Sequence, residues 1–144
     1  MLRKILIFSF ACFMAFILIG CVSSNKKKDV MLAGPKVLEP QPGDKFTDIP
    51  VPSGLKIAAK KSYDFYNGST RIALLKYTGR KNANDLVSFY KEQMPMNGWT
   101  LVNLVEYDQR LMNFEKEGEN CIINIQPSWN SVLVTVALGP KNKR

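Results

Sequence analysis

The sequence predicts an α+β fold in the order ββαββββ, a curled antiparallel sheet with one helix packed on a face. Three observations support this class. The pair Asn67-Gly68 separates two runs of aromatic and aliphatic residues, a pattern typical of a β-hairpin. Apolar residues then recur at helical spacing after Asn82. Four strand-length runs with short connections follow, and every second residue from Val132 to Leu138 is valine or leucine. A cleaved signal helix and a flexible linker are expected to precede this domain.

The first twenty residues have the features of a secretory signal peptide. Arg3 and Lys4 precede a mostly apolar run from Ile5 to Ile19. This run is shorter than the roughly twenty apolar residues that span a bilayer. We therefore expect residues 1–20 to be a signal peptide that is removed. The alternatives are an uncleaved anchor helix and an ordinary secretory signal that ends beside a cysteine by chance.

The end of this run, Leu18-Ile19-Gly20-Cys21, resembles the lipobox of bacterial lipoproteins. The resemblance implies that the thiol of Cys21 carries a diacylglyceryl group and that the signal is cut between Gly20 and Cys21. The new amino group is often acylated in that family, typically with palmitate. Acyl chains contribute about 0.8 kcal/mol per buried CH₂, so two or three of them hold a protein on a membrane.

The residue after the cysteine bears on the destination. In Gram-negative lipoproteins an aspartate there often marks retention in the inner membrane, and here the position is Val22. The resemblance therefore favours the periplasmic side of the outer membrane. In an organism with one membrane, the destination is the outer face of that membrane.

Residues 21–47 are predicted to be a lipidated N-terminus followed by a disordered linker. The segment is rich in proline and lysine and has no periodic apolar pattern. Fully extended, such a segment reaches roughly 90 Å, and as a flexible coil it averages about 30 Å. Lys26, Lys27 and Lys28 form either a solvated spacer or a minor contact with anionic lipid.

Residues 48–139 are predicted to form the folded domain. Its first segment, Asp48-Ile49-Pro50-Val51-Pro52, is expected to be extended, because alternate prolines exclude it from the inside of a sheet. Ile49 and Val51 are expected to be buried at the domain edge. A proline-rich ligand for a partner is the other interpretation of this segment. A basic tail, residues 140–144, ends the chain.

The hairpin and the helix have clear boundaries in the sequence. Asn67 and Gly68 are expected at the two positive-φ positions of a type I′ turn. The helix, of about sixteen residues, is expected to begin after Asn82 as its N-cap and to end near Gly98 in the left-handed conformation. Pro95 should loosen its last turn, and Trp99 should pack back on the helix. The apolar stripe of the helix consists of Leu86, Phe89, Tyr90, Gln93 and Met94.

Four strands are predicted after the helix, over residues 100–107, 110–116, 120–126 and 131–138, as an antiparallel meander. This order of elements resembles the helix-grip kind of domain seen in small envelope lipoproteins. The strings that carry the resemblance to small uncharacterised bacterial lipoproteins are Leu86-Val-Ser-Phe-Tyr-Lys-Glu-Gln-Met94, Gly98-Trp99 and Phe114-Glu-Lys116. The resemblance covers residues 48–139 and implies a class of protein without supplying catalytic residues.

The charge of the chain is concentrated at its ends. The formal net charge is +8, but residues 47–139 hold ten basic and nine acidic residues. A nearly neutral domain argues against a nucleic-acid surface, on which basic residues gather on one face. The chain has no histidine and three cysteines. Zinc fingers, haem attachment and Ser-His or Cys-His catalysis therefore lack their usual residues.

Cys121 and Trp129 are the two single residues of interest in the domain. Cys121 alternates with Ile123 and Ile125, so we expect it in the core as a small apolar side chain. A mixed disulfide is the alternative. Trp129 lies at a predicted hairpin tip, where an exposed aromatic ring is a common anchor for a partner. The alternative is that Trp129 folds down on the helix or on a neighbouring strand.

Two clusters have weaker functional interpretations. One combines aromatic and basic side chains that suit single-stranded nucleic acid, although an envelope compartment argues against that partner: Tyr63, Phe65 and Tyr66 beside Lys60, Lys61 and Arg71. The other is a group of acids whose spacing faintly resembles a calcium loop, which solvated hairpin charges explain better: Asp108, Glu115, Glu117 and Glu119. No metal site and no cofactor is expected.

The sequence therefore predicts a membrane-anchored, non-catalytic binding or assembly module of the cell envelope. Its partner is expected to be an envelope protein or a wall or lipid component, and not a nucleic acid. The lipid on Cys21 localises the module, and Trp129 is the candidate contact with the partner. The alternative is a small envelope hydrolase or lipid-binding enzyme, which needs a cleft lined by carboxylates such as Glu106 or Asp108.

Overall fold

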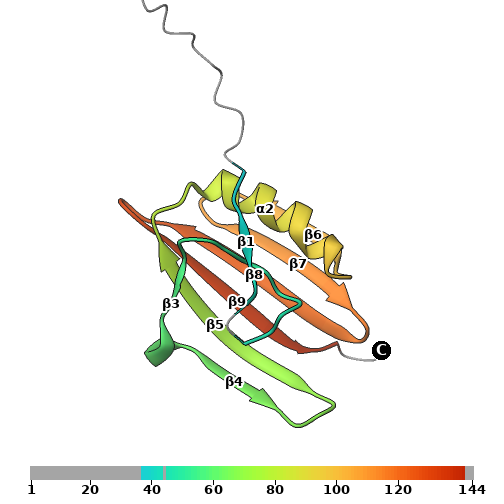
Figure 1. Ribbon diagram of the computed structural model, residues 1–144. Coiled ribbons are helices and arrows are strands. Elements are labelled where there is room, and N and C mark those ends of the chain that lie inside the picture. The colour runs from blue at the N-terminus through green and yellow to red at the C-terminus, as the bar shows by residue number, and fades with distance from the viewer. Residues whose placement is uncertain (1–36, 44, 142–144) are drawn as a thin grey trace, which may run out of the picture. The chain divides into compact units, whose positions relative to one another are not determined.

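The computed structural model describes residues 37–43 and 45–141, and they form one antiparallel sheet with a helix and a short N-terminal ribbon (Figure 1). No helix in this described part is both long enough and apolar enough to cross a bilayer. The elements are, in order, β1 Pro40–Gln41, β2 Val51–Pro52, β3 Lys56–Ile57, the 3₁₀ turn η1 Ala59–Lys61, β4 Tyr63–Tyr66, β5 Arg71–Gly79, α2 Ala83–Met96, β6 Thr100–Glu106, β7 Arg110–Lys116, β8 Glu119–Pro127 and β9 Val132–Pro140.

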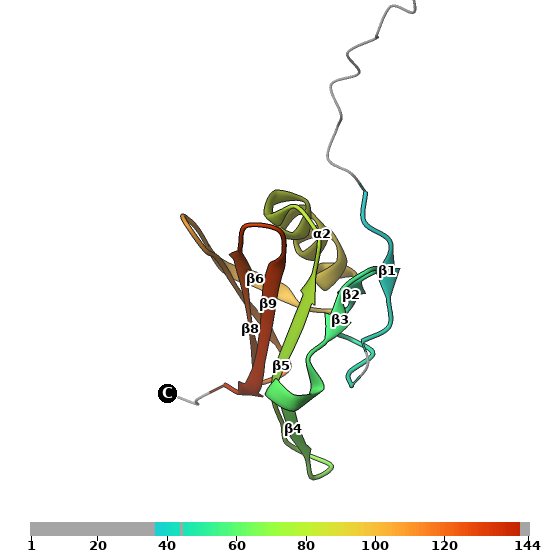
Figure 2. The same ribbon diagram turned by 90° about the vertical axis from the view of Figure 1, so that its left-hand side faces the viewer.

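The main sheet has the strand order β3-β5-β9-β8-β7-β6, and β4 pairs with the part of β5 that β3 leaves free. All of its pairings are antiparallel. The sheet is curled but not closed, and α2 packs across one face in contact with β6, β7 and β8 (Figure 2). The predicted α+β class, the order ββαββββ from β4 to β9 and the meander β6–β9 are therefore confirmed. The long-range pairing of β5 with β9 joins the first hairpin to the meander.

The helix is bounded as its sequence predicts. The Oδ1 atom of Asn82 accepts a hydrogen bond from the backbone N–H of Asn84 at 2.8 Å, as an N-cap does. At the other end Gly98 has φ +84°, the left-handed conformation that closes a helix. Pro95 is accommodated inside the last turn. The apolar face of α2 is buried against the sheet: Leu86, Val87, Phe89, Tyr90 and Met94.

The predicted type I′ turn at Asn67-Gly68 is wrong, although the hairpin itself forms. Tyr66 pairs with Arg71, so four residues connect β4 to β5, and only Gly68 of the pair has a positive φ. The side chain of Asn67 closes this loop by accepting hydrogen bonds from the N–H groups of Ser69 and Thr70. A side-chain cap of this kind competes with the tighter backbone turn.

The two-residue turn with positive φ lies between β7 and β8. Lys116 pairs with Glu119, and the two residues between them, Glu117 and Gly118, have φ +46° and +83°. These values suit a type I′ turn, whose backbone twist matches that of the flanking strands.

The folded part begins earlier than residue 48. Residues 38–43 and 45–47 were assigned by the sequence to the linker, yet β1 pairs with β2 and Leu38 is buried. The N–H of Ser53 also donates to the carbonyl of Glu39 at 2.9 Å. The physical reason is that Leu38 supplies an apolar side chain that the domain edge can bury beside Ile49 and Val51, which are buried as predicted.

Proline keeps this ribbon separate from the main sheet. β1 and β2 form a two-stranded sheet of their own, and each contains a proline that cannot donate to a ladder. At the other terminus β9 runs to Pro140, and the N–H of Lys141 donates to the carbonyl of Gly118 at 2.7 Å. The predicted tail is therefore partly folded, and residues 142–144 lie outside the described residues.

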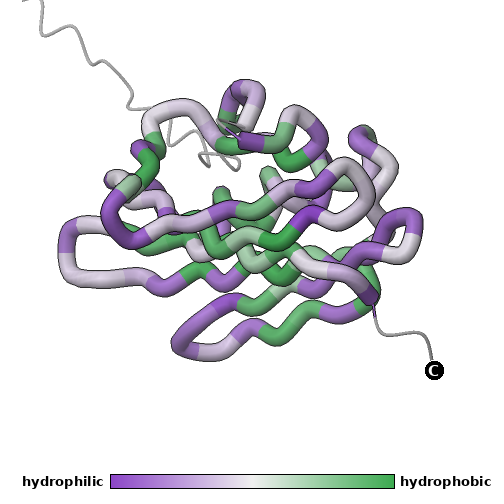
Figure 3. Tube along the Cα trace, turned by 90° about the horizontal axis from the view of Figure 1, so that it is seen from below, coloured by the Kyte–Doolittle hydropathy of each residue, from purple (hydrophilic) through white to green (hydrophobic). Residues whose placement is uncertain are grey.

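The core lies between α2 and the inner face of the sheet. In Figure 3 the hydrophobic residues run along the middle of the strands and the turns at their ends are hydrophilic. On β8 and β9 every second side chain is buried, because one face of each strand lies toward the core and the other does not. The largest fully buried side chains include Trp99, Tyr77, Tyr90 and Phe114.

Candidate binding site

One open groove of about 790 Å³ lies at the end of the domain that carries the β4–β5 loop and the β7–β8 turn. The segment 45–48 forms its remaining wall. The chain brings these three segments together through the pairing of β5 with β9 and of β8 with β7 and β9. Charged side chains line much of the groove.

Arg71 is the centre of the charges in this groove. Its Nη1 and Nη2 atoms donate to the two carboxylate oxygens of Asp48 at 2.7 and 3.0 Å. Its Nε atom donates to Glu119 at 2.9 Å, and Nη2 donates to the same carboxylate. Lys116 donates to Asp48 at 3.0 Å and to the carbonyl of Asn97 at 3.0 Å. We call Asp48, Arg71, Lys116 and Glu119 the charged cluster.

Aromatic rings and a backbone contact fix the charged cluster in place. The guanidinium of Arg71 lies 5.3 Å from the ring centre of Phe46, and the ammonium of Lys116 lies 5.7 Å from that of Trp99. The indole Nε1 of Trp99 donates to the backbone carbonyl of Asp48 at 2.9 Å. The cluster therefore ties the segment 45–48 to β5, β7 and β8.

The pKa shifts show that these charges stabilise one another. Burial alone would raise the pKa of Asp48, but the hydrogen bonds and charges of Arg71 and Lys116 outweigh it and lower that pKa below its ordinary value. The hydrogen bonds to Glu119 and Asp48 raise the pKa of Arg71 further above its ordinary range. A carboxylate with a lowered pKa suits ion pairing better than proton donation.

Sequence reasoning missed the charged cluster. Its members are separated by 23, 48 and 68 residues along the chain. No local spacing reveals such contacts, because they depend on which strands become neighbours. The only signal available was a set of charged residues beside predicted turns, which is common on any surface.

The space between α2 and the sheet is filled by side chains. Cys121 is buried there, which confirms its predicted core position, and burial raises the pKa of its thiol to about 12. Tyr90 is completely buried, and its hydroxyl has no hydrogen-bond partner among the described residues. Burial also raises the pKa of Tyr90. The rings of Phe89 and Tyr90 meet edge to face at 5.2 Å.

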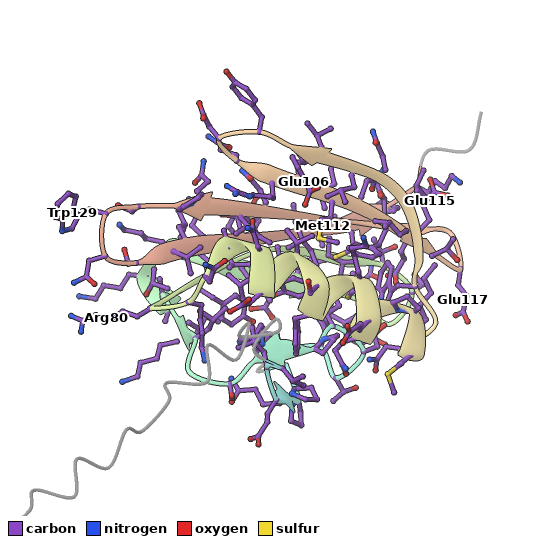
Figure 4. The ribbon with its side chains drawn as sticks, turned by 90° about the horizontal axis from the view of Figure 1, so that it is seen from above. Arg80, Glu106, Met112, Glu115, Glu117 and Trp129 are labelled. Atoms are coloured by element: carbon purple, nitrogen blue, oxygen red, sulfur yellow. The ribbon has the colours of Figure 1, made fainter. Side chains whose placement is uncertain are left out.

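Trp129 lies at the opposite end of the sheet from the charged cluster, at the tip of the β8–β9 hairpin (Figure 4). Its side chain is fully exposed, so the alternative that it folds down on the helix or a strand is wrong. A second open groove, of about 460 Å³, runs beside it. Three cations line that groove, namely Arg80, Lys81 and Arg110.

The aromatic patch on β4 is exposed as the sequence implies. Tyr63, Phe65 and Tyr66 are each more than half exposed. Arg71 does not join them as a free cation, because its guanidinium is engaged by Asp48 and Glu119. The combination that would suit single-stranded nucleic acid, a partner that the sequence disfavours, therefore loses one of its basic residues.

The structure brings three of the sequence-selected acids, Glu115, Glu117 and Glu119, to the lining of a third open groove of about 360 Å³. Glu106 and Asp108 are exposed and line none of these three grooves. Glu115 pairs with Lys141, and Glu119 belongs to the charged cluster. Within residues 37–43 and 45–141 no group of carboxylates or thiols is placed to hold a metal ion. The predicted signal peptide, Gly20 and Cys21, which is the predicted site of lipid attachment, lie outside the described residues.

One comparison with known proteins identifies a family, and its match covers most of the main sheet and the helix. Neither the curated proteins nor the solved structures contain a match to this chain. A family model described as START domain-like matches residues 64–141, which run from β4 to the end of β9 and make up more than half of the chain. The description indicates a ligand-binding module. The chain belongs to the START domain-like family.

Proposed function

We propose that the protein is a lipid-anchored, non-catalytic binding module of the bacterial cell envelope. The sequence Leu18-Ile19-Gly20-Cys21 supports the anchor, because it resembles a lipobox at the end of a signal peptide. Membership in the START domain-like family supports a binding role. The outer membrane, on its periplasmic side, is the favoured location in a Gram-negative cell.

The observation that carries the proposal is the contrast between the two tryptophans of the chain. Trp99 is buried and hydrogen-bonded, whereas Trp129 is fully exposed at a hairpin tip. Exposing a ring of this size to water forgoes roughly 1.5–3 kcal/mol of burial free energy, and exposed aromatic residues are frequent anchors at interfaces. We assign Trp129 as the contact with another component of the envelope, which is a protein, the wall or the lipid itself.

The module works by local concentration. The acyl chains keep the domain near the membrane, and the segment before residue 38 sets how far it reaches. A contact that is weak in free solution then becomes frequent, because the second encounter is intramolecular. No chemical step is required of the domain.

The anchor is tested by Cys21→Ala in cells fed a labelled fatty acid. The variant should lose the label and accumulate as an unprocessed precursor, since the thiol is the proposed acceptor. The matched control is Cys12→Ala, which changes a cysteine inside the apolar run and should keep the label. Retention of label by Cys21→Ala contradicts the anchor.

The contact is tested by a photo-reactive amino acid at position 129, followed by mass spectrometry of the products from intact cells. Position 96 is the control. Met96 is also well exposed, but it lies at the C-terminal end of α2 and does not line the groove beside Trp129. Products specific to position 129 support the contact. The same products at both positions contradict it. Trp129→Ala should change the melting temperature little, because the side chain touches no core residue.

An alternative is a small envelope hydrolase or lipid-binding enzyme. The groove with the charged cluster favours it, because Asp48, Asp64 and Glu119 line a cleft. Against it, Asp48 has a lowered pKa and is engaged by two cations. Turnover of an ester or glycoside substrate that is lost in Glu119→Gln, with the fold retained, would establish the enzyme.

A further inference from the structure

The end of the domain that carries Trp129 is built from three loops. Pro127 pairs with Val132 and Gly79 pairs with the same residue, so the β8–β9 tip and the β5–α2 connection lie side by side. Arg110 pairs with Ile125, which places the β6–β7 tip at this end as well. Figure 4 shows Arg80 and Trp129 projecting from the same side of the molecule.

Cations surround Trp129 in this end of the domain. Arg80 and Lys81 line the groove beside it and have no ion pair within the described residues, and Arg110 lines it from the next hairpin. Arg110 donates to Asn84 at 3.1 Å and to the carbonyl of Asp108 at 3.3 Å. The acids nearby, at positions 85, 106 and 108, do not line the groove.

We propose that this end docks on the surface of a phospholipid bilayer that contains anionic headgroups, with Trp129 inserted at the interface and Arg80, Lys81 and Arg110 over the phosphates. An amphipathic indole ring favours the boundary between headgroups and acyl chains. Each cation held near an anionic surface adds to the attraction. Tyr107, which is 80% exposed on the β6–β7 tip, is a second aromatic residue at this end.

The chemistry around Trp129 favours lipid over a protein partner. The centre of a protein interface is usually a continuous apolar patch from which charged residues are depleted. Here most residues that line the groove with the ring are polar or basic, including Asn82, Ser128 and Asn130, and only Ala83 and Pro127 are apolar. An exposed indole among cations matches a membrane interface, in which anionic headgroups lie over an apolar layer of acyl chains.

The inference rests on the proposed function, because only the lipid on Cys21 keeps this end beside a bilayer. Docking then orients the tethered domain. The charged cluster lies at the opposite end of the sheet, so docking through Trp129 directs the larger groove away from the lipid and toward the space where a partner or ligand is met.

The test uses the full lipidated chain in vesicles of phosphatidylcholine, with or without phosphatidylglycerol, in which the phosphatidylcholine carries bromine on its acyl chains. Bromine quenches a nearby indole. The chain has two tryptophans, and Trp99 is buried. Trp129→Phe therefore reports Trp99 alone, and its spectrum is subtracted. The signal of Trp129 should be quenched and shifted to the blue when phosphatidylglycerol is present.

Charge variants make the test specific. Arg80→Gln and Lys81→Gln should each lower the docking equilibrium constant roughly fivefold, as expected for one cation near an anionic surface. The matched control is Lys60→Gln with Lys61→Gln, two exposed cations on η1, which should change nothing. High salt should weaken docking of the parent chain.

The outcomes separate the two proposals. A chain that washes off all vesicles contradicts the lipid anchor. A chain that stays on the vesicles while Trp129 is unquenched, or is quenched equally without phosphatidylglycerol, overturns the docking proposal alone. Shielding of Trp129 that appears only in native membranes containing proteins also overturns it, in favour of a protein partner.

Discussion

Replacing Asp48 by asparagine tests whether the charged cluster fastens the N-terminal segment to the sheet. The substitution keeps the shape of the side chain and removes its charge. Asp48 accepts three charge-assisted hydrogen bonds, two from Arg71 and one from Lys116. Its backbone carbonyl, which accepts from Trp99, is untouched.

The expected loss of unfolding free energy is about 2 kcal/mol. A hydrogen bond to a charged group contributes about 1.5–3 kcal/mol when buried. Three such bonds overstate the cost here, because the side chain of Asp48 is 21% exposed and each cation keeps another acceptor, Glu119 or the carbonyl of Asn97. In a domain of this size a loss of about 2 kcal/mol lowers the melting temperature by about 8 °C.

The pH dependence has a definite sign. The pKa of Asp48 is lowered in the folded state from an ordinary value of 3.8. Its carboxylate therefore stabilises the fold fully above that value, and the contribution is lost as the pH falls through the lowered pKa. The gap in stability between the parent chain and Asp48→Asn should be constant near neutral pH and should shrink below pH 3.8.

Chemical unfolding of both chains at several pH values measures this gap. Lys45→Met is the control, because Lys45 pairs with Asp64 across 3.2 Å but the two side chains are 46% and 34% exposed. Such a pair contributes about 0.5 kcal/mol or less. A loss in Asp48→Asn no larger than in the control, or a gap unchanged at low pH, refutes the reasoning.

Three further outcomes are expected. Gly118→Ala should lower the free energy of unfolding by about 1–2 kcal/mol, because φ is +83° at this position. Gly139→Ala should leave it nearly unchanged, because the backbone there is unstrained and nothing lies within 4 Å of the added carbon. Equal losses of stability in thermal unfolding would contradict this prediction. The thiol of Cys121 should react with a thiol reagent only on unfolding, because it is buried and its pKa is about 12; rapid modification of the native chain argues against its core position. Tyr90→Phe should leave the free energy of unfolding unchanged or raise it by about 1 kcal/mol, because it removes a buried hydroxyl without a hydrogen-bond partner among the described residues. A large loss of stability would mean that this hydroxyl is hydrogen-bonded.

The helix and the strands could be predicted because their signals are local. The N-cap at Asn82, the left-handed Gly98 and the apolar stripe of α2 depend on residues within a few positions of one another. The predicted type I′ turn of the hairpin was wrong for a reason that is also local. The side chain of Asn67 accepts a hydrogen bond within its own loop, and this loop replaces the expected turn. Local sequence signals predict that a hairpin forms more reliably than they predict the conformation of the turn between its strands.

The start of the domain was predicted too late because burial is not a local property. Leu38 stands among prolines and polar residues, which indicates a linker when the segment is considered alone. It is buried because Ile49 and Val51 present an apolar edge to it. The same holds for Trp129, for which the sequence left exposure and burial equally open.

The sequence by itself predicted α2, the strands from β4 to β9 and the alternation that makes one face of β8 and β9 apolar, because each depends on spacing along the chain. The tertiary structure decided that β5 lies beside β9, that Arg71 meets Asp48 and Glu119, and that Trp129 stands in solvent among cations. Those outcomes depend on which distant segments become neighbours, and this is settled by the burial of the whole sheet and helix at once.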